Sequence, residues 1–156
     1  LGDALAVALM EHRQFSPADY RDFHPGGSLG ARLSKVGDLM QTELPSVPQS
    51  AQMTDALLVM SEKGFGIVAV TNTADELCGV ITDGDLRRHM NGLLERTAEE
   101  VMTHAPLTVS PDVLAQEAVA LMNAKSVTCL IVAHPSDKLN AIGIIRIHDC
   151  LRAGVI

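Results

Sequence analysis

The sequence lacks the features that mark nucleic-acid-binding, membrane-spanning and secreted proteins. Its 12 Lys and Arg residues are outnumbered by 19 Asp and Glu residues, giving a formal net charge of −7 and no basic footprint for nucleic acid. The longest apolar stretch, residues 4–10, is far shorter than the roughly 20 residues that span a bilayer. No segment resembles a signal peptide. We therefore expect a cytoplasmic protein with neither a nucleic-acid nor a membrane partner.

Cysteine and metal-ligand patterns are also scarce. The three cysteines, Cys78, Cys129 and Cys150, lie far apart in apolar or helix-like surroundings and cannot all pair within one chain. This usage is typical of reduced thiols rather than of a disulfide framework. The six histidines show no HxxxH or HxxE spacing and no CxxC occurs, so we expect no metal site.

What the sequence does contain is enough apolar material for a folded core. Its 156 residues are 47% hydrophobic and 20% charged, values close to those of globular proteins rather than of disordered ones. A chain of this length suits one ordinary domain or two small ones.

An internal repeat with an offset of 62 residues organises most of the chain. Residues 37–40 align with residues 99–102, and both segments end in Met. Each copy then has four apolar positions at the i, i+3, i+4, i+7 spacing of an amphipathic helix, preceded by Ser50 or Asp112 as expected N-caps. These positions are Met53, Ala56, Leu57 and Met60 in the first copy and Ala115, Ala118, Val119 and Met122 in the second.

Each predicted helix is followed by two predicted strands. Residues 65–70 and 129–133 form short apolar, β-branched runs typical of buried strands. The second strands, 79–81 and 141–145, are offset by 64, so the second hairpin loop is two residues longer. A unit of about 60 residues has a small core, and two copies can bury their open sheet faces against each other. We expect pseudo-twofold symmetry and a cleft with two related pockets.

These residues resemble the tandem cystathionine β-synthase (CBS) domain pair. The likeness rests on the repeated openings at residues 38–40 and 100–102, and on the segment 79–87, Gly-Val-Ile-Thr-Asp-Gly-Asp-Leu-Arg. It implies an α/β fold class: two CBS repeats, residues 36–95 and 96–156, preceded by an N-terminal helical segment. CBS pairs are generally regulatory sensors of enzymes, channels or transporters and often bind adenosyl nucleotides in the cleft.

The N-terminal segment resembles the end of the sugar isomerase (SIS) domain in bacterial arabinose-5-phosphate isomerases. Residues 1–10, 13–15 and 23–30 carry this likeness, so residues 1–35 are expected to be the tail of an SIS domain. That family interconverts D-ribulose 5-phosphate and D-arabinose 5-phosphate, supplying Kdo for lipopolysaccharide or capsule. Because Leu1 lies within an apolar, helix-like stretch, we expect the chain to be a fragment of such an enzyme.

His24 is the one residue of this segment with an expected catalytic role. From the sequence alone, its His-Pro-Gly-Gly context is typical of an exposed loop. The isomerase resemblance instead implies a catalytic histidine that moves protons through an enediol, acting only in the intact parent. The fragment itself is expected to have no isomerase turnover, because one histidine cannot orient a sugar phosphate.

Thr82 and Asp85 are the strongest binding candidates. Their Thr-x-x-Asp spacing fits a capping box at a helix start. The CBS resemblance implies in addition that the Thr82 hydroxyl lies beside a ligand phosphate and that Asp85 binds ribose hydroxyls. Since Asp83 and Asp85 would repel a phosphate, binding requires arginines such as Arg87 and Arg88 to compensate.

Arg146 and Asp149 are the corresponding pair in the second repeat. Asp149 keeps the carboxylate of Asp85, but Arg146 stands where the first repeat has Thr82, a departure from the family pattern. Arg146 either supplies a phosphate-binding guanidinium or destroys the second pocket.

Together these features predict a regulatory CBS pair of an arabinose-5-phosphate isomerase. It requires no cofactor and senses an adenine nucleotide or a nucleotide-activated end product such as CMP-Kdo. Its protein partners are its own SIS domain and a second copy, in a homodimer formed through the CBS pairs. The alternative is a ligand-free oligomerisation module of an SIS-family sugar-phosphate isomerase. A third reading places the module in a different SIS sugar-phosphate isomerase.

Overall fold

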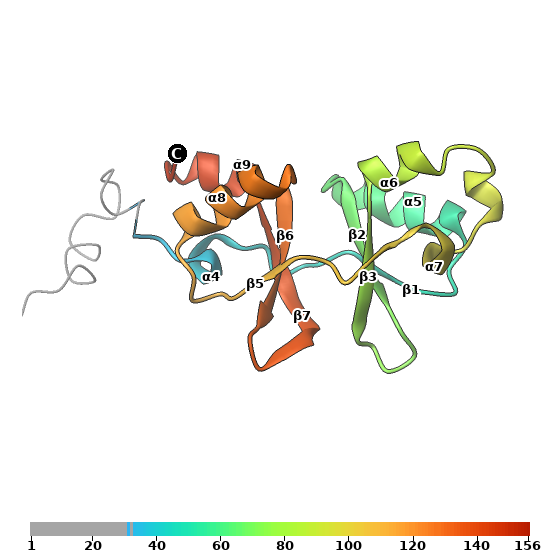
Figure 1. Ribbon diagram of the computed structural model, residues 1–156, viewed down its shortest axis with the longest axis horizontal. Helices are drawn as coiled ribbons and strands as arrows, with labels where there is room; N and C mark the ends of the chain where they lie inside the picture. Colours follow the sequence, from blue (N-terminus) through green and yellow to red (C-terminus); the bar gives the residue numbers. More distant parts are fainter. Residues whose placement is uncertain (1–30, 32) are drawn as a thin grey trace, which may run out of the picture.

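A computed structural model describes residue 31 and residues 33–156 of the chain. Two α/β halves lie side by side, with their main helices at one end and their β-hairpins at the other (Figure 1). The mixed α/β class is confirmed. His24 and the expected N-terminal helical segment lie outside the described residues.

The two halves contain the same succession of elements. The first is built from β1 (Ser46–Pro48), α5 (Met53–Lys63), β2 (Ile67–Thr71), β3 (Leu77–Thr82) and α6 (Asp83–Arg88). The second is built from β5 (Thr108–Val109), α8 (Ala115–Lys125), β6 (Cys129–His134), β7 (Asp137–Arg146) and α9 (Ile147–Arg152). The remaining elements are α4 (Val36–Leu39), η1 (Leu93–Glu95), α7 (Ala98–Val101) and β4 (Thr103–His104).

Strand pairing is the same in both halves except that the first sheet has a fourth strand, β4. The strand order is β1-β2-β3-β4 in one sheet and β5-β6-β7 in the other. β1 and β5 run parallel to β2 and β6, and the hairpins β2-β3 and β6-β7 are antiparallel. The parallel pairs are possible because α5 and α8 supply the crossover connections that parallel strands need.

The segments that open the two sequence repeats, residues 34–41 and 96–104, each pack into the other half. We call them the exchanged segments. Val36 lies in the hydrophobic core of the second half, and its amide donates to the Val113 carbonyl at 2.8 Å. Ala98 lies in the core of the first half, and its amide donates to the Ala51 carbonyl at 2.8 Å. The sequence repeats at 36–95 and 96–156 therefore differ from the packing units.

This exchange also explains how the two long helices begin. Neither Ser50 nor Asp112 is an N-cap as predicted: the caps are Gln52 and Leu114, and neither makes a side-chain capping bond. Backbone carbonyls from the exchanged segments accept first-turn amides instead. These bonds run from Met53 N to Arg96 O at 3.0 Å and from Ala115 N to Ser34 O at 2.8 Å.

Two equivalent glycines allow the exchanged segments to approach the hairpins. A Cβ at Gly143 would overlap the Gln41 carbonyl oxygen, and one at Gly79 would overlap the Met102 side chain. Hydrogen bonds then join Gln41 to Ile144, and β4 pairs with β3. Glycine is favoured at both positions because a backbone oxygen at Gly143 and the Met102 side chain at Gly79 lie where a Cβ would be.

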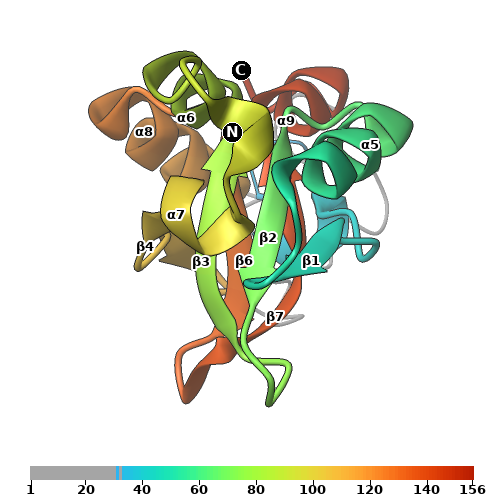
Figure 2. The same cartoon turned by 90° about the vertical axis from the view of Figure 1, so that its right-hand side faces the viewer.

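A third hydrophobic cluster joins the two sheets. It consists of Ile67, Ala69, Leu77 and Val80 from the first half and Ile131 and Ile144 from the second. In Figure 2 the hairpins β2-β3 and β6-β7 extend in the same direction, away from the helices. The prediction that the repeats close over a shared seam is confirmed. Across residues 31 and 33–156, no helix has the length and apolar character needed to traverse a bilayer.

Candidate functional site

A cavity of about 860 Å³ opens between the two halves. Residues 64–67, at the end of α5 and the start of β2, line it from the first half, and residues 125–129 line it from the second. Of the four predicted binding residues, Thr82, Asp85 and Arg146 line this cavity together. Asp149 is not among the lining residues.

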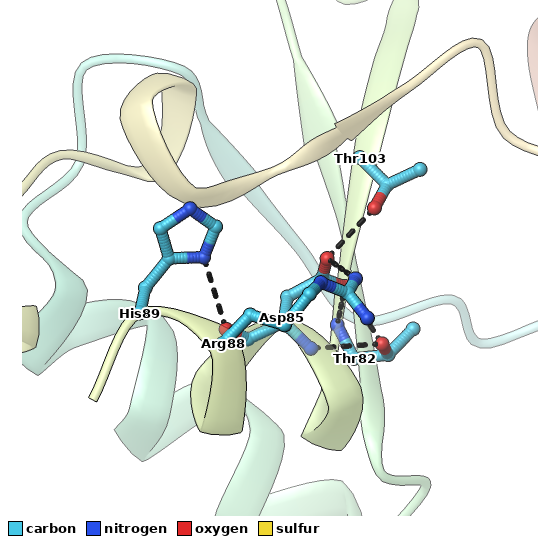
Figure 3. A network of polar contacts seen from close by, with 5 residues as sticks. All are labelled: Thr82, Asp85, Arg88, His89 and Thr103. Carbon is cyan, nitrogen blue, oxygen red and sulfur yellow. Dashed lines mark hydrogen bonds and ion pairs between the residues drawn. The ribbon is translucent and has the colours of Figure 1, made fainter.

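Thr82 and Asp85 are held in one hydrogen-bond network (Figure 3). Thr82 caps α6, and its amide and hydroxyl donate to Asp85 Oδ2 at 2.8 and 2.6 Å. Asp85 Oδ1 accepts from the Thr103 hydroxyl at 2.7 Å and from the Arg88 guanidinium. The predicted capping box is present, and the carboxylate, only 2% exposed, has four donors.

The network keeps Asp85 ionised. Burial by itself raises the pKa of this carboxyl, but the hydrogen bonds from Thr82, Thr103 and Arg88 outweigh burial and lower the pKa below its usual value. Asp85 is therefore a hydrogen-bond acceptor at neutral pH, suited to hydroxyl groups.

Thr103 was missed by the sequence reasoning. It comes from β4, which pairs with β3 and so brings residues 18 positions apart into contact. The available signal was its position: Thr103 directly follows the repeated opening that ends in Met102, as Gln41 follows Met40.

Arg146 and Asp149 form a second, closed network. Arg146 Nε donates to Asp149 Oδ2 at 2.9 Å, and Nη2 donates to Oδ1 at 2.8 Å. Gln41 Nε2 adds a bond to Oδ1 at 3.3 Å, and the guanidinium carbon lies 4.3 Å from the centre of the Phe65 ring. The hydrogen bonds from Arg146 outweigh burial and lower the pKa of Asp149.

Cationic groups outnumber carboxylates around the cavity. Its lining includes two carboxylates and four fixed cations, which are Asp83, Asp85, Arg87, Arg88, Lys125 and Arg146. Because Arg88 and Arg146 each pair with an aspartate, Arg87 and Lys125 supply the remaining positive charge. The cavity therefore favours an anionic ligand that also carries hydroxyl groups.

The described residues offer little for metal or thiol chemistry. Within residues 31 and 33–156, no three His, Cys, Asp or Glu side chains gather as metal ligands. Cys129 lines the cavity, but burial raises the pKa of its thiol. A thiol with a raised pKa is a poor nucleophile at neutral pH.

The family model of the CBS domain matches residues 36–92 and 98–156. The chain belongs to the CBS domain family. The sequence-based identification of a CBS pair is thereby confirmed.

Curated relatives add a likeness along nearly the whole chain. A probable arabinose 5-phosphate isomerase of Haemophilus influenzae is 43% identical over 94% of this chain and 44% of its own length. Arabinose 5-phosphate isomerase KdsD of Pseudomonas aeruginosa is 41% identical over 100% of this chain and 49% of its own length. The resemblance to this isomerase family is confirmed, and the CBS chain spans about half the length of these relatives.

A solved structure carries the same fold. The crystal structure of CBSX2 in complex with AMP matches 78% of this CBS pair and 96% of its own chain, with 27% identity and a TM-score of 0.68.

Proposed function

We propose that this CBS pair is a regulatory module that binds an adenine nucleotide in the cavity between its halves. The observation that carries the proposal is the cavity of about 860 Å³ that Thr82, Asp85, Arg87 and Lys125 line together. The AMP complex of the CBSX2 relative supports an adenine nucleotide as the ligand.

The ribose would bind at Asp85. All four acceptor positions of this carboxylate are in use, so a ribose hydroxyl must replace one donor. The Arg88 side chain is the donor most easily replaced, because it is 63% exposed and can turn into solvent. Thr82 and Thr103 would remain and hold the carboxylate in place.

The phosphate would lie near the free cations. Arg87 and Lys125 line the cavity from opposite halves, and Arg88 becomes available once ribose displaces it from Asp85. These charges offset the repulsion from Asp83 and Asp85. A ligand that contacts both halves is a physical route by which occupancy changes their relative position.

We further propose that the intact protein is an arabinose-5-phosphate isomerase of the cytoplasm. In this proposal residues 1–35 belong to the SIS domain, His24 completes its active site, and the CBS pair reports nucleotide or CMP-Kdo occupancy to that domain. The identities of 41–43% to such isomerases support the proposal. The 156-residue chain itself is expected to show no turnover when ribulose 5-phosphate is added.

Calorimetric titration tests the binding proposal. AMP, ATP and CMP-Kdo are titrated separately into the 156-residue chain, with ribulose 5-phosphate as the comparison ligand. Binding of AMP or ATP is expected, and Asp85→Asn is expected to weaken it at least about tenfold through loss of a charged acceptor. Asp137→Asn, at an exposed hairpin position, is the matched control and should bind as the unsubstituted chain does. Absence of heat with all three nucleotides contradicts the proposal.

Two exposed leucines favour a second function, assembly of isomerase subunits. Leu58 on α5 is 64% exposed and Leu151 on α9 is 49% exposed, which suits an apolar contact with a second copy. Light scattering should then show a nucleotide-independent dimer that Leu58→Glu or Leu151→Glu converts to a monomer. A stable dimer with no nucleotide binding would favour this function over sensing.

A further inference from the structure

We infer that the second nucleotide site of the pair is occupied by the side chain of Arg146, so that the module binds one nucleotide rather than two. This inference rests on the proposed function at the first site. It also answers which role Arg146 has: its guanidinium blocks the second pocket instead of binding a phosphate there.

The internal repeat matches each residue of the first site with one residue of the second. Offsets of 62 and 64 residues relate the cavity wall of the first site to an equivalent wall in the second. The equivalent pairs are Thr82 and Arg146, Asp85 and Asp149, Thr103 and Gln41, Ala105 and Glu43, Lys125 and Lys63, and Val127 and Phe65. Apart from the Asp and Lys pairs, the second site has the larger side chain at each position.

Arg146 lies between Asp149 and Phe65 at the second site, and both Arg146 and Phe65 also line the cavity that contains Thr82 and Asp85. Arg146 starts at the end of β7, binds Asp149 with two nitrogen atoms at 2.8 and 2.9 Å, and places its guanidinium over Phe65 of the first half. With Gln41 and the Arg146 amide also donating, every acceptor position on Asp149 that a ribose diol needs is taken. The cavity accordingly includes Asp85 but not Asp149.

A second ion pair engages the lysine of this site. Lys63 Nζ donates to Glu43 Oε2 at 2.7 Å, so this ammonium group already has a carboxylate partner. At the first site Ala105 replaces Glu43, and Lys125 lines the cavity with no ion pair to any described residue. A phosphate therefore finds a free ammonium group at the first site only.

The guanidinium on each aspartate differs in how readily it can leave. Arg88 is 63% exposed and reaches Asp85 through a single nitrogen atom. Arg146 is 18% exposed, binds through two nitrogens and lies against an aromatic ring. Bidentate, partly buried pairs are more costly to separate than exposed ones, so ligand displaces Arg88 but not Arg146.

The stoichiometry of AMP binding tests the inference. Calorimetry is expected to give one AMP per unsubstituted chain and two per chain in Arg146→Thr, which restores the hydroxyl of the first repeat. Arg146→Lys retains the charge without the two-nitrogen contact and should open the second site partially. This variant tests the inference even if Arg146→Thr does not fold. Arg152→Thr, at an exposed arginine at the end of α9, is the matched control and should remain at one. The reciprocal variant Thr82→Arg should lose AMP binding.

Each result has a separate consequence. Two AMP per unsubstituted chain, or one per correctly folded Arg146→Thr chain, overturns the inference and leaves the proposed function standing. Binding of AMP to Arg146→Thr only would contradict nucleotide sensing at the first site and support the blocking role of Arg146. Absence of binding to both proteins contradicts the proposed function, and the inference is then decided without nucleotide.

The hydrogen bond of the Arg146 side chain tests the inference in the absence of nucleotide. In ¹H–¹⁵N spectra at neutral pH, its Nε–H should give an exchange-protected signal, because it donates to Asp149 at 2.9 Å. The signal should vanish in Arg146→Thr and lose protection in Asp149→Asn. An unprotected Nε–H in the unsubstituted chain overturns the inference.

Discussion

The two CBS repeats share a backbone but not a binding site. α5 and α8 have the same length of 11 residues, and the two sheets have the same β-strand connections. Asp85 and Asp149 occupy the same N3 position of a capping box. Asp85 lies beside the small residues Thr82 and Thr103, whereas Asp149 lies beside the larger Arg146 and Gln41, with Phe65 against the Arg146 guanidinium. The N3 aspartate is the same in both repeats, whereas the N-cap residue, which also lines the cleft, differs: Thr82 in one and Arg146 in the other.

Each site also depends on both repeats. Asp85 accepts from Thr103, which precedes β5, and Asp149 accepts from Gln41, which precedes β1. Neither site is therefore complete within one sequence repeat. Each needs a residue from the segment that opens the other repeat.

The largest expected effect is the difference in folding between two fragments of the chain, one that follows a packing unit and one that follows a sequence repeat. A fragment of residues 46–105 retains β1 to β4 with α7, and hence the full core cluster that includes Val47, Ala98 and Met102. A fragment of residues 36–95 has the same length but lacks α7 and β4. Circular dichroism and limited proteolysis should show residual structure in 46–105 and a largely unfolded 36–95, because the second fragment loses core burial. Equal structure in both would show that the exchanged segments are dispensable.

The two close-approach glycines should differ in their tolerance of a methyl group. At Gly143 the obstacle is the backbone carbonyl of Gln41, which cannot move without breaking its pairing with Ile144. At Gly79 the nearest obstacle is the flexible side chain of Met102. We expect Gly143→Ala to destabilise by about 3 kcal/mol and Gly79→Ala by about 1 kcal/mol in urea unfolding. The reverse order would contradict this account of the exchange.

Acid should destabilise the fold through both aspartates. The folded-state pKa values of Asp85 and Asp149 are lowered, so their contribution is fully present above the unfolded-state pKa of about 3.9. It is lost as the pH falls below that value toward the lower folded-state pKa. Thermal unfolding between pH 6 and pH 2 should show this loss, and it should be shallower in Asp85→Asn and in Asp149→Asn. An unchanged pH profile in both variants would contradict the assigned pKa directions.

The smallest effect concerns the ends of the two long helices. Gly64 and Ser126 occupy equivalent left-handed positions, with φ values of 62° and 54°. A side chain disfavours this conformation, so Ser126→Gly should stabilise the chain by about 0.5–1 kcal/mol and Gly64→Ser should destabilise it by a similar amount. Chemical denaturation of both variants measures the difference, and effects of the same sign would contradict the equivalence of the two ends.

Several features were predictable from the sequence because they depend on local patterns. The offset of 62 residues indicated both helices, and the apolar runs indicated β2 and β6. The spacing of Thr82 and Asp85 indicated a capping box, which the structure contains. The N-cap predictions at Ser50 and Asp112 were wrong, because the backbone carbonyls of Arg96 and Ser34, distant in sequence, accept the first-turn amides.

The sequence alone determined that there are two copies of one motif, where their helices and hairpins lie, and that Thr82 and Asp85 stand together. These features follow from spacing and periodicity within a few residues. Only the tertiary structure decided that the openings are exchanged, that Thr103 reaches Asp85, and that Arg146 binds Asp149 while lying over Phe65. The exchange and the Thr103 and Phe65 contacts join segments far apart in the chain, and the way Arg146 closes depends on where those segments lie. Each depends on how closely two backbones approach, which the pattern of residue types does not encode.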